Sequence, residues 1–188
     1  TPDISLEVII GQAEENMYRQ KLNESRSIRH ALITFLEESL QETTQETKEH
    51  SMRLQEMAQQ MGQVLHLSFR QLIELDLLAR LHDLGKIAIP QNILNKPGPL
   101  SPEEWEKVKQ HPEIGYRIAQ SSPDLISIGE SILVHHERWD GLGYHRGIKG
   151  EEIPLNARII TIIDAYDVMV NGRPYKNPMT PEEALNEL

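Results

Sequence analysis

Apolar residues recur at helical spacing through the first quarter of the chain. The spacing predicts helices over residues 6–22 and 28–40, with a break in the polar residues 23–27 between them. A nearly wholly polar continuation of the second helix covers residues 42–49. The chain therefore starts with amphipathic helices, one face of which is apolar.

The same spacing continues toward the C-terminus. Residues 52–65 and 69–84 predict two helices, and the second is apolar enough to be central. A further helix starts at residues 101–104, Pro112 interrupts it after His111, and a short helix runs to about residue 119. Residues 125–136 and 155–170 are also helical, and a last helix opens at 180–183 and is cut off by the chain end. Residues 87–100 and the Gly-rich residues 137–154 are predicted loops. Since no segment alternates with period two, we expect an all-α fold.

The amino-acid composition excludes several classes of function. The 188 residues contain no cysteine, which excludes disulfides, thiolate catalysis and cysteine-bound zinc. A net charge of -10 argues against binding a nucleic acid polymer, so a small anionic substrate requires a locally positive site. There is no apolar run of membrane-spanning length and no secretory leader, so we expect a cytoplasmic protein without membrane contact from this segment.

Histidine and carboxylate residues provide the candidate chemistry. His50 follows Glu46 by one helical turn, and His82 and Asp83 are adjacent within an apolar helix. His111 lies at a helix junction, His135 and His136 end a helix beside the Gly-rich loop, and Asp164 interrupts an apolar run. Each residue alone has an ordinary structural interpretation, as a cap, a surface pair or a satisfied core residue. Five such places in one small domain instead predict a site for two or three transition metals.

Several motifs carry a family resemblance. The run from His82 to Lys86 resembles the HD-x-GK signature of the HD-GYP family. The similarity continues in chain order through Ile89-Pro90, Leu94-Asn95-Lys96-Pro97-Gly98, His111-Pro112, His135-His136-Glu137-Arg138, Asp140-Gly141, Gly143-Tyr144, Ile153-Pro154, Asp164-Ala165-Tyr166-Asp167 and Arg173-Pro174-Tyr175. It spans roughly residues 27 to 188, which we expect to be one domain with a truncated C-terminal end.

The resemblance implies a metal-dependent phosphodiesterase with the helical HD-superfamily fold and a Gly-rich loop near its metals. Its expected substrate is cyclic di-GMP, and its products are linear pGpG, GMP or both. By the resemblance, Asp83 bridges two metals, with His50, His82 and Asp164 on one side and His111, His135 and His136 on the other. Glu46 would hold a third metal. Iron and manganese are favoured, with zinc, nickel and magnesium as alternatives.

The resemblance also implies substrate contacts. Metals at Asp83 would lower the pKa of a bridging water and bind the scissile phosphate, which makes Asp83 and Lys86 the expected catalytic residues. Lys86 lies one turn from His82, where it can also contact a phosphate. Tyr144, Arg173 and Lys176 match family positions that contact the dinucleotide.

Two features modify this interpretation. His145 stands where the family's GYP triplet has proline, a change that can loosen the loop. We expect His145 to be a solvated loop residue. Residues 1–26 form a linker helix in which Ala13-Glu14, Met17-Tyr18 and Lys21 resemble the last helix of a GGDEF domain. GGDEF domains, in the same chain or another, are therefore possible partners, and a homodimer is also possible.

Two other functions stay open at this point. One is an HD phosphohydrolase of another nucleotide, which includes guanosine alarmones and mixed cyclic dinucleotides. The Gly143-Tyr144 loop and the segment around Arg173 argue against simpler HD enzymes, which lack both. The other is a receptor or docking module that binds a cyclic dinucleotide without cleaving it. The complete set of predicted ligands argues against that alternative.

Overall fold

The computed structural model describes residues 6–44, 47–172 and 177–188, with the side chains of residues 6–13 excepted. These residues form helices and turns and contain no strand, which confirms the all-α prediction. The chain divides into two compact units, residues 1–36 and 37–188. No helix within the described ranges combines the length and apolar character needed to cross a membrane.

Helix α1 (Leu6–Thr43) is continuous, so the predicted break at residues 23–27 is wrong. Those residues are polar, but they include neither glycine nor proline, and an exposed Asn or Ser costs a helix less than about 1 kcal/mol, too little to break it. Helix α1 ends at Thr43, and α2 (Lys48–Val64) begins five residues later. The predicted helical continuation through residue 49 is therefore also wrong. The side chain of Thr47 caps α2 by accepting a hydrogen bond from the backbone amide of His50.

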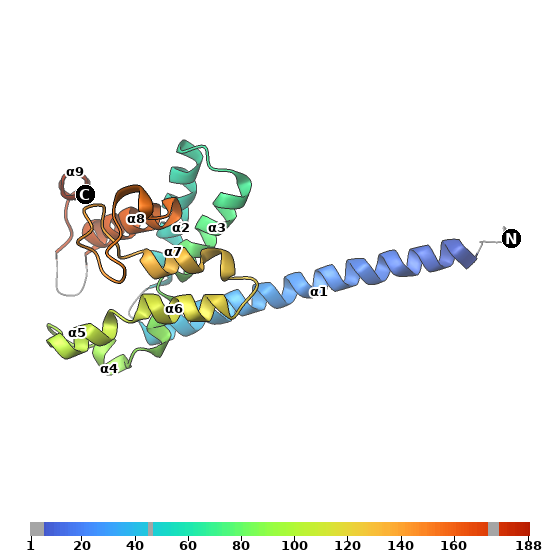
Figure 1. Ribbon diagram of the computed structural model, residues 1–188, viewed down its shortest axis with the longest axis horizontal. Coiled ribbons are helices and arrows are strands. Elements are labelled where there is room, and N and C mark those ends of the chain that lie inside the picture. The colour runs from blue at the N-terminus through green and yellow to red at the C-terminus, as the bar shows by residue number, and fades with distance from the viewer. Residues whose placement is uncertain (1–5, 45–46, 173–176) are drawn as a thin grey trace. The chain divides into compact units, whose positions relative to one another are not determined.

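Three helices form the centre of the second unit. Helices α2, α3 (Phe69–Leu81) and α8 (Leu155–Asn171) pack against one another, although α8 is distant in sequence (Figure 1). Leu54 of α2, Leu78 of α3 and Ile160 of α8 are fully buried. Burial of these apolar faces stabilises the unit and places the polar residues of the same helices at defined positions.

Shorter helices surround this centre, and their bounds refine the predictions. The predicted loop at residues 87–100 contains α4 (Gln91–Leu94), and the segment 101–119 forms α5 (Pro102–Val108) and α6 (His111–Gln120). The predicted helix at 125–136 consists of η2 (Ile126–Ile128) and α7 (Gly129–Val134). The loop after it contains only η3 (Gly150–Glu152), and α9 (Pro181–Glu187) is the last helix.

Helix α3 ends three residues earlier than predicted. It is followed by the short 3-10 helix η1 (Leu84–Ala88), which packs closely against α6. A Cβ atom on Gly85 would lie 1.9 Å from the carbonyl oxygen of His111 and 2.6 Å from the amide nitrogen of Gly115. Only glycine permits this approach of two backbones. The contact brings the end of α3 beside the start of α6.

Candidate metal centre

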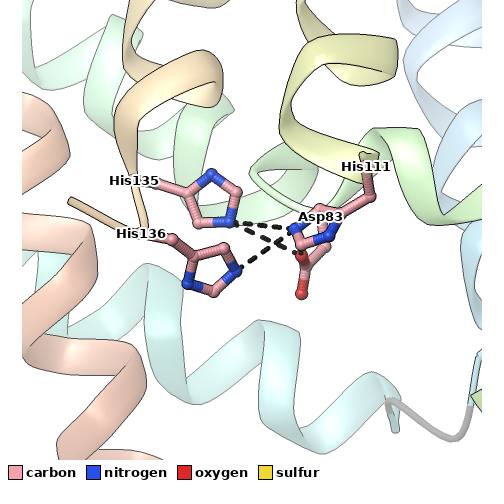
Figure 2. A group of neighbouring side chains, drawn as sticks. All are labelled: Asp83, His111, His135 and His136. Atoms are coloured by element: carbon pink, nitrogen blue, oxygen red, sulfur yellow. Dashed lines mark hydrogen bonds and ion pairs between the residues drawn. The ribbon is translucent and has the colours of Figure 1, made fainter. Parts of the chain in front are cut away.

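Seven of the predicted ligand side chains lie together in two groups. The first contains Asp83, His111, His135 and His136, and the second contains His50, His82 and Asp164. Within each group, one ligand atom from every residue lies within 4.8 Å of all the others. Figure 2 shows the three imidazoles of the first group turned toward Asp83. The eighth predicted ligand, Glu46, lies outside the described residues, before the start of α2.

The Asp83 carboxylate stands between the two groups. Its Oδ1 atom lies 3.0 Å from His111 Nε2 and 3.6 Å from His135 Nε2, both in the first group. Its Oδ2 atom lies 3.3 Å from Nε2 of His82 in the second group. One carboxylate therefore faces ligands on both sides, each through a different oxygen.

Backbone carbonyl groups fix the orientation of three histidine rings. Nδ1 of His111 lies 2.7 Å from the oxygen of Val108, and Nδ1 of His135 lies 2.6 Å from that of Ile132. His82 repeats the pattern with Ala79, at 3.3 Å. A carbonyl oxygen only accepts hydrogen bonds, so each Nδ1 must donate its proton. In the neutral ring, the lone pair is then on Nε2, the atom that points into the site.

His50 is oriented by a carboxylate. Its Nδ1 lies 2.7 Å from Asp167 Oδ2, and its Nε2 lies 3.5 Å from Asp164 Oδ1. Arg53 donates two hydrogen bonds to Asp167, at 2.6 and 2.8 Å, and Asn171 donates a third at 2.9 Å. Burial opposes ionisation of Asp167, but its bonds to Arg53 and His50 hold its pKa below the usual value. Asp167 is thus a charged acceptor that leaves Nε2 of His50 free to bind a metal.

Electrostatics sets the charge of the first group. Burial opposes ionisation of Asp83, but the neighbouring Lys86 ammonium outweighs it and holds the pKa of the carboxyl well below the usual value. Lys86, on η1, donates a hydrogen bond to Oδ2 of Asp83. Burial lowers the pKa of both His135 and His136, which favours neutral rings. An ionised carboxylate with neutral imidazoles is the protonation state that a metal site requires.

The donor set fits divalent metals. Oδ1 of Asp83 is buried, and among the described residues it finds no hydrogen-bond donor of adequate geometry. Nε2 of His111 lies 3.4 Å from Nε2 of His135 and 3.2 Å from Nε2 of His136. Since His111 and His135 carry their protons on Nδ1, two nitrogen lone pairs face each other, an arrangement that a cation between them would stabilise. Imidazole nitrogen with carboxylate oxygen suits iron, manganese or zinc.

The Gly-rich loop packs against the first group. The buried Glu137 carboxylate accepts hydrogen bonds from the amides of Arg146 and Gly147, at 2.5 and 3.0 Å. A Cβ atom on Gly143 would lie 2.4 Å from the Cα of Glu137, so the loop folds back onto its own start. The next residue, Tyr144, stacks on His136 with ring centroids 4.8 Å apart. The loop therefore places an aromatic side chain directly on a candidate ligand.

Tyr144 and His145 differ in their surroundings. Burial, and then the Asp83 carboxylate, raise the pKa of the Tyr144 phenol, so it keeps its proton at neutral pH. His145 is exposed and belongs to neither ligand group, as expected of a solvated loop residue. Its φ of 113° is one that proline, held near -65°, does not adopt. The replacement of the family's proline therefore accompanies a different backbone conformation at this position.

Sequence reasoning missed the residues that support the ligands. It gave no role to Asp167, Arg53 or Glu137, although each has one in the geometry. Asp167 carried a usable signal, because it lies three residues after Asp164 on the same helix. The two predicted substrate contacts at Arg173 and Lys176 lie outside the described residues, as Glu46 does.

Comparison with known proteins places the chain in a family. Residues 34–188 match the family described as "HD domain". The chain belongs to the HD domain family. This assignment and the relatives that follow confirm the resemblance carried by the His82-Asp83 motif and the segments after it.

The chain is 52% identical over 117 residues to a cyclic di-GMP phosphodiesterase of Thermotoga maritima, covering 61% of this chain and 32% of that protein. It is 43% identical over 110 residues to the 3'3'-cGAMP-specific phosphodiesterase 2 of Vibrio cholerae, covering 57% and 21%. The matched part is therefore a third or less of either relative. Among solved structures, the protein Bd1817 from Bdellovibrio bacteriovorus, described as an HDG"Y"P protein, matches with a TM-score of 0.55 and 23% identity. That match covers 73% of this chain and 50% of Bd1817, and it supports the HD fold.

Proposed function

We propose that this chain hydrolyses a phosphodiester bond of cyclic di-GMP with divalent metals held by the two ligand groups. The observation that carries the proposal is the placement of Asp83, whose oxygens face His111 on one side and His82 on the other. Divalent metals supply a Lewis acid for the scissile phosphate and lower the pKa of a coordinated water. Asp83 would bridge two of them.

The histidines and Asp164 would complete the metal ligands on the two sides of Asp83. Iron or manganese is the proposed metal, with zinc, nickel and magnesium as alternatives. A third metal is proposed at Glu46. In support, Thr47, the residue after Glu46, lines a small cavity together with His50 and His82 of the second group.

Lys86 and Tyr144 are proposed to contact the substrate directly. Lys86 is hydrogen-bonded to Asp83, where its ammonium charge can stabilise a phosphate at the metals. The protonated Tyr144 phenol can donate a hydrogen bond, because its pKa is raised. Arg173 and Lys176 are proposed to bind the phosphates or guanine edges of the dinucleotide.

The names of the relatives support a cyclic dinucleotide as the substrate. The Thermotoga relative, with 52% identity, favours cyclic di-GMP. A mixed cyclic GMP-AMP dinucleotide is the second candidate, because a Vibrio relative with 43% identity is named as specific for it. The two substrates differ in one base, so selection between them must come from residues that contact bases.

The cellular setting is also a proposal. A cytoplasmic location is proposed because the proposed reaction belongs to second-messenger signalling. The GGDEF-like pattern in residues 1–26 supports GGDEF domains as proposed partners, and a homodimer is the second proposed assembly.

Turnover assays on matched variants test the proposal. Purified protein should convert cyclic di-GMP to pGpG or GMP, and the two cyclic dinucleotides should be compared by kcat/KM. Asp83→Ala should lose at least one metal by elemental analysis and lose turnover with it. The exposed-pair variant Glu113→Gln is a matched control that should retain both. Full turnover by metal-free protein, or by Asp83→Ala, would refute the metal-dependent mechanism.

A further inference from the structure

Three aromatic rings form a row that leads from the first ligand group to the surface. Tyr144 stacks on His136, with ring planes 26° apart. Tyr144 also meets Trp105 edge to face, with centroids 6.0 Å apart and planes at 72°. Trp105 is 44% exposed, whereas His136 and Tyr144 are mostly covered. The row therefore ends in an indole that water can reach.

Helix α5 ties Trp105 to the ligand group. The helix starts at a capping box in which Ser101 and Glu104 bond to each other's backbone amides, and Lys96 binds Glu104 at 2.6 Å. One turn after Trp105, the carbonyl of Val108 accepts the Nδ1 proton of His111. The same short helix thus orients a candidate ligand and carries the exposed indole. Trp105 is fixed relative to the site, although it contributes no ligand.

A molecule that binds at both the first ligand group and this row of rings must carry an anionic part and a planar part. The ligand group attracts an anion once metals are bound, and phosphate is the anion of the proposed substrates. An exposed indole beside a phosphate site is suited to stack a planar heterocycle. A purine nucleotide has both parts, joined by a ribose.

The other tryptophan provides a contrast. Trp139 is more exposed than Trp105, but it lies outside the row, and the Arg158 guanidinium lies over its ring, 5.8 Å from the centroid. Exposure of an indole alone therefore does not mark a base site. Contact with Tyr144, and through it with His136, distinguishes Trp105.

We infer that Trp105, with Tyr144, forms a base-stacking subsite that holds one purine of the substrate. The inference rests on the proposed function, because the position of the phosphate comes from the proposed metal ligands. It adds a substrate contact on α5. Since every purine has a stacking face, Trp105 contributes affinity for the base more than discrimination between guanine and adenine.

Fluorescence tests the subsite without requiring turnover. The chain contains two tryptophans, so in Trp139→Phe all indole emission comes from Trp105. This variant, purified with its metals, is titrated with GMP and, separately, with ribose 5-phosphate, which lacks only the base. GMP should change the emission saturably, and ribose 5-phosphate should not. Unchanged emission at saturating GMP, or equal effects of the two ligands, would overturn the inference.

Variants at Trp105 provide the second measurement. By calorimetry, Trp105→Ala should bind GMP about tenfold to a hundredfold more weakly, while Trp105→Phe keeps most of the affinity. In the cyclic di-GMP assay, Trp105→Ala should raise KM and leave kcat and metal content unchanged. Wild-type GMP affinity in Trp105→Ala would disprove the stacking contact. If the base-dependent signal appears but wild-type protein does not cleave cyclic di-GMP, the subsite stands and the proposed reaction fails. If wild-type protein cleaves cyclic di-GMP but GMP leaves the Trp105 emission unchanged, the subsite fails and the proposed reaction stands.

Discussion

Replacement of Asp167 by asparagine tests how the second ligand group is oriented. Asp167 accepts the Nδ1 proton of His50 at 2.7 Å, which leaves the lone pair on Nε2. The introduced side-chain amide would have nearly the same shape as the carboxylate, but one of its two polar atoms is a donor. Where that NH₂ group faces His50, it favours the tautomer with the proton on Nε2, and a protonated Nε2 does not bind a metal. Where it faces Arg53, two donors oppose each other.

The geometry sets the expected size of two losses, one in metal affinity and one in the free energy of unfolding. Loss of a partner that orients a ligating histidine typically costs tenfold to a hundredfold in metal affinity, about 1.4–2.7 kcal/mol. The free energy of unfolding should also fall, because Asp167 accepts four hydrogen bonds and is buried. Arg53 is 37% exposed, so water can replace part of what it loses. We therefore expect a loss of about 1–3 kcal/mol, below the 3–5 kcal/mol typical of a broken buried ion pair.

Metal titration and nuclear magnetic resonance separate this role from a merely structural one. Metal-stripped Asp167→Asn, titrated with Mn²⁺ against a competing chelator, should lose affinity at one site while the other stays near wild type. The ring nitrogen signals of His50 in metal-free protein should show a shift toward the Nε2-protonated tautomer. Glu113→Gln, which removes an exposed carboxylate, is the control. Wild-type affinity at both sites with an unchanged His50 tautomer would refute the reasoning.

Three further predictions concern the loop and the substrate. Gly143→Ala places a Cβ 2.4 Å from backbone, so we expect a loss of about 1–3 kcal/mol of unfolding free energy and weakened cyclic di-GMP turnover, measured by denaturation and kinetics. A fully active, equally stable variant would contradict this packing. His145→Gly should gain about 1 kcal/mol, because glycine adopts a φ of 113° without strain, and His145→Pro should lose stability. A melting temperature that proline leaves unchanged would argue against this backbone conformation. Arg173→Ala and Lys176→Ala should each weaken cyclic di-GMP binding about tenfold to a hundredfold at unchanged metal content. Wild-type affinity and turnover in both variants would mean that these charges are merely solvated.

Much of the fold follows from local sequence. Helical spacing of apolar residues predicts most helices, because this signal acts within one or two turns. The structure adds side-chain caps at Ser68, Ser101 and Thr180, which fix where α3, α5 and α9 begin. The ligand residue types were also evident, since histidine and aspartate inside apolar segments need a reason to be there. Helix ends were less predictable. Helix α3 stops at Leu81, and the turn after it brings Gly85 against the backbone of His111, a contact that no local pattern contains.

The grouping of the ligands and their supporting partners was decided by tertiary structure. His50 and Asp167 are 117 positions apart, and only the packing of α2 against α8 brings them together. Asp83 faces both groups because the end of α3 lies between residues from α2 and α8 on one side and from α6 and α7 on the other. Sequence by itself therefore predicted which side chains could gather as metal ligands, but it placed His82, Asp83, His135 and His136 inside helices that end just before them. Their distances, tautomers and charges came from long-range packing, because those properties depend on neighbours distant in the chain.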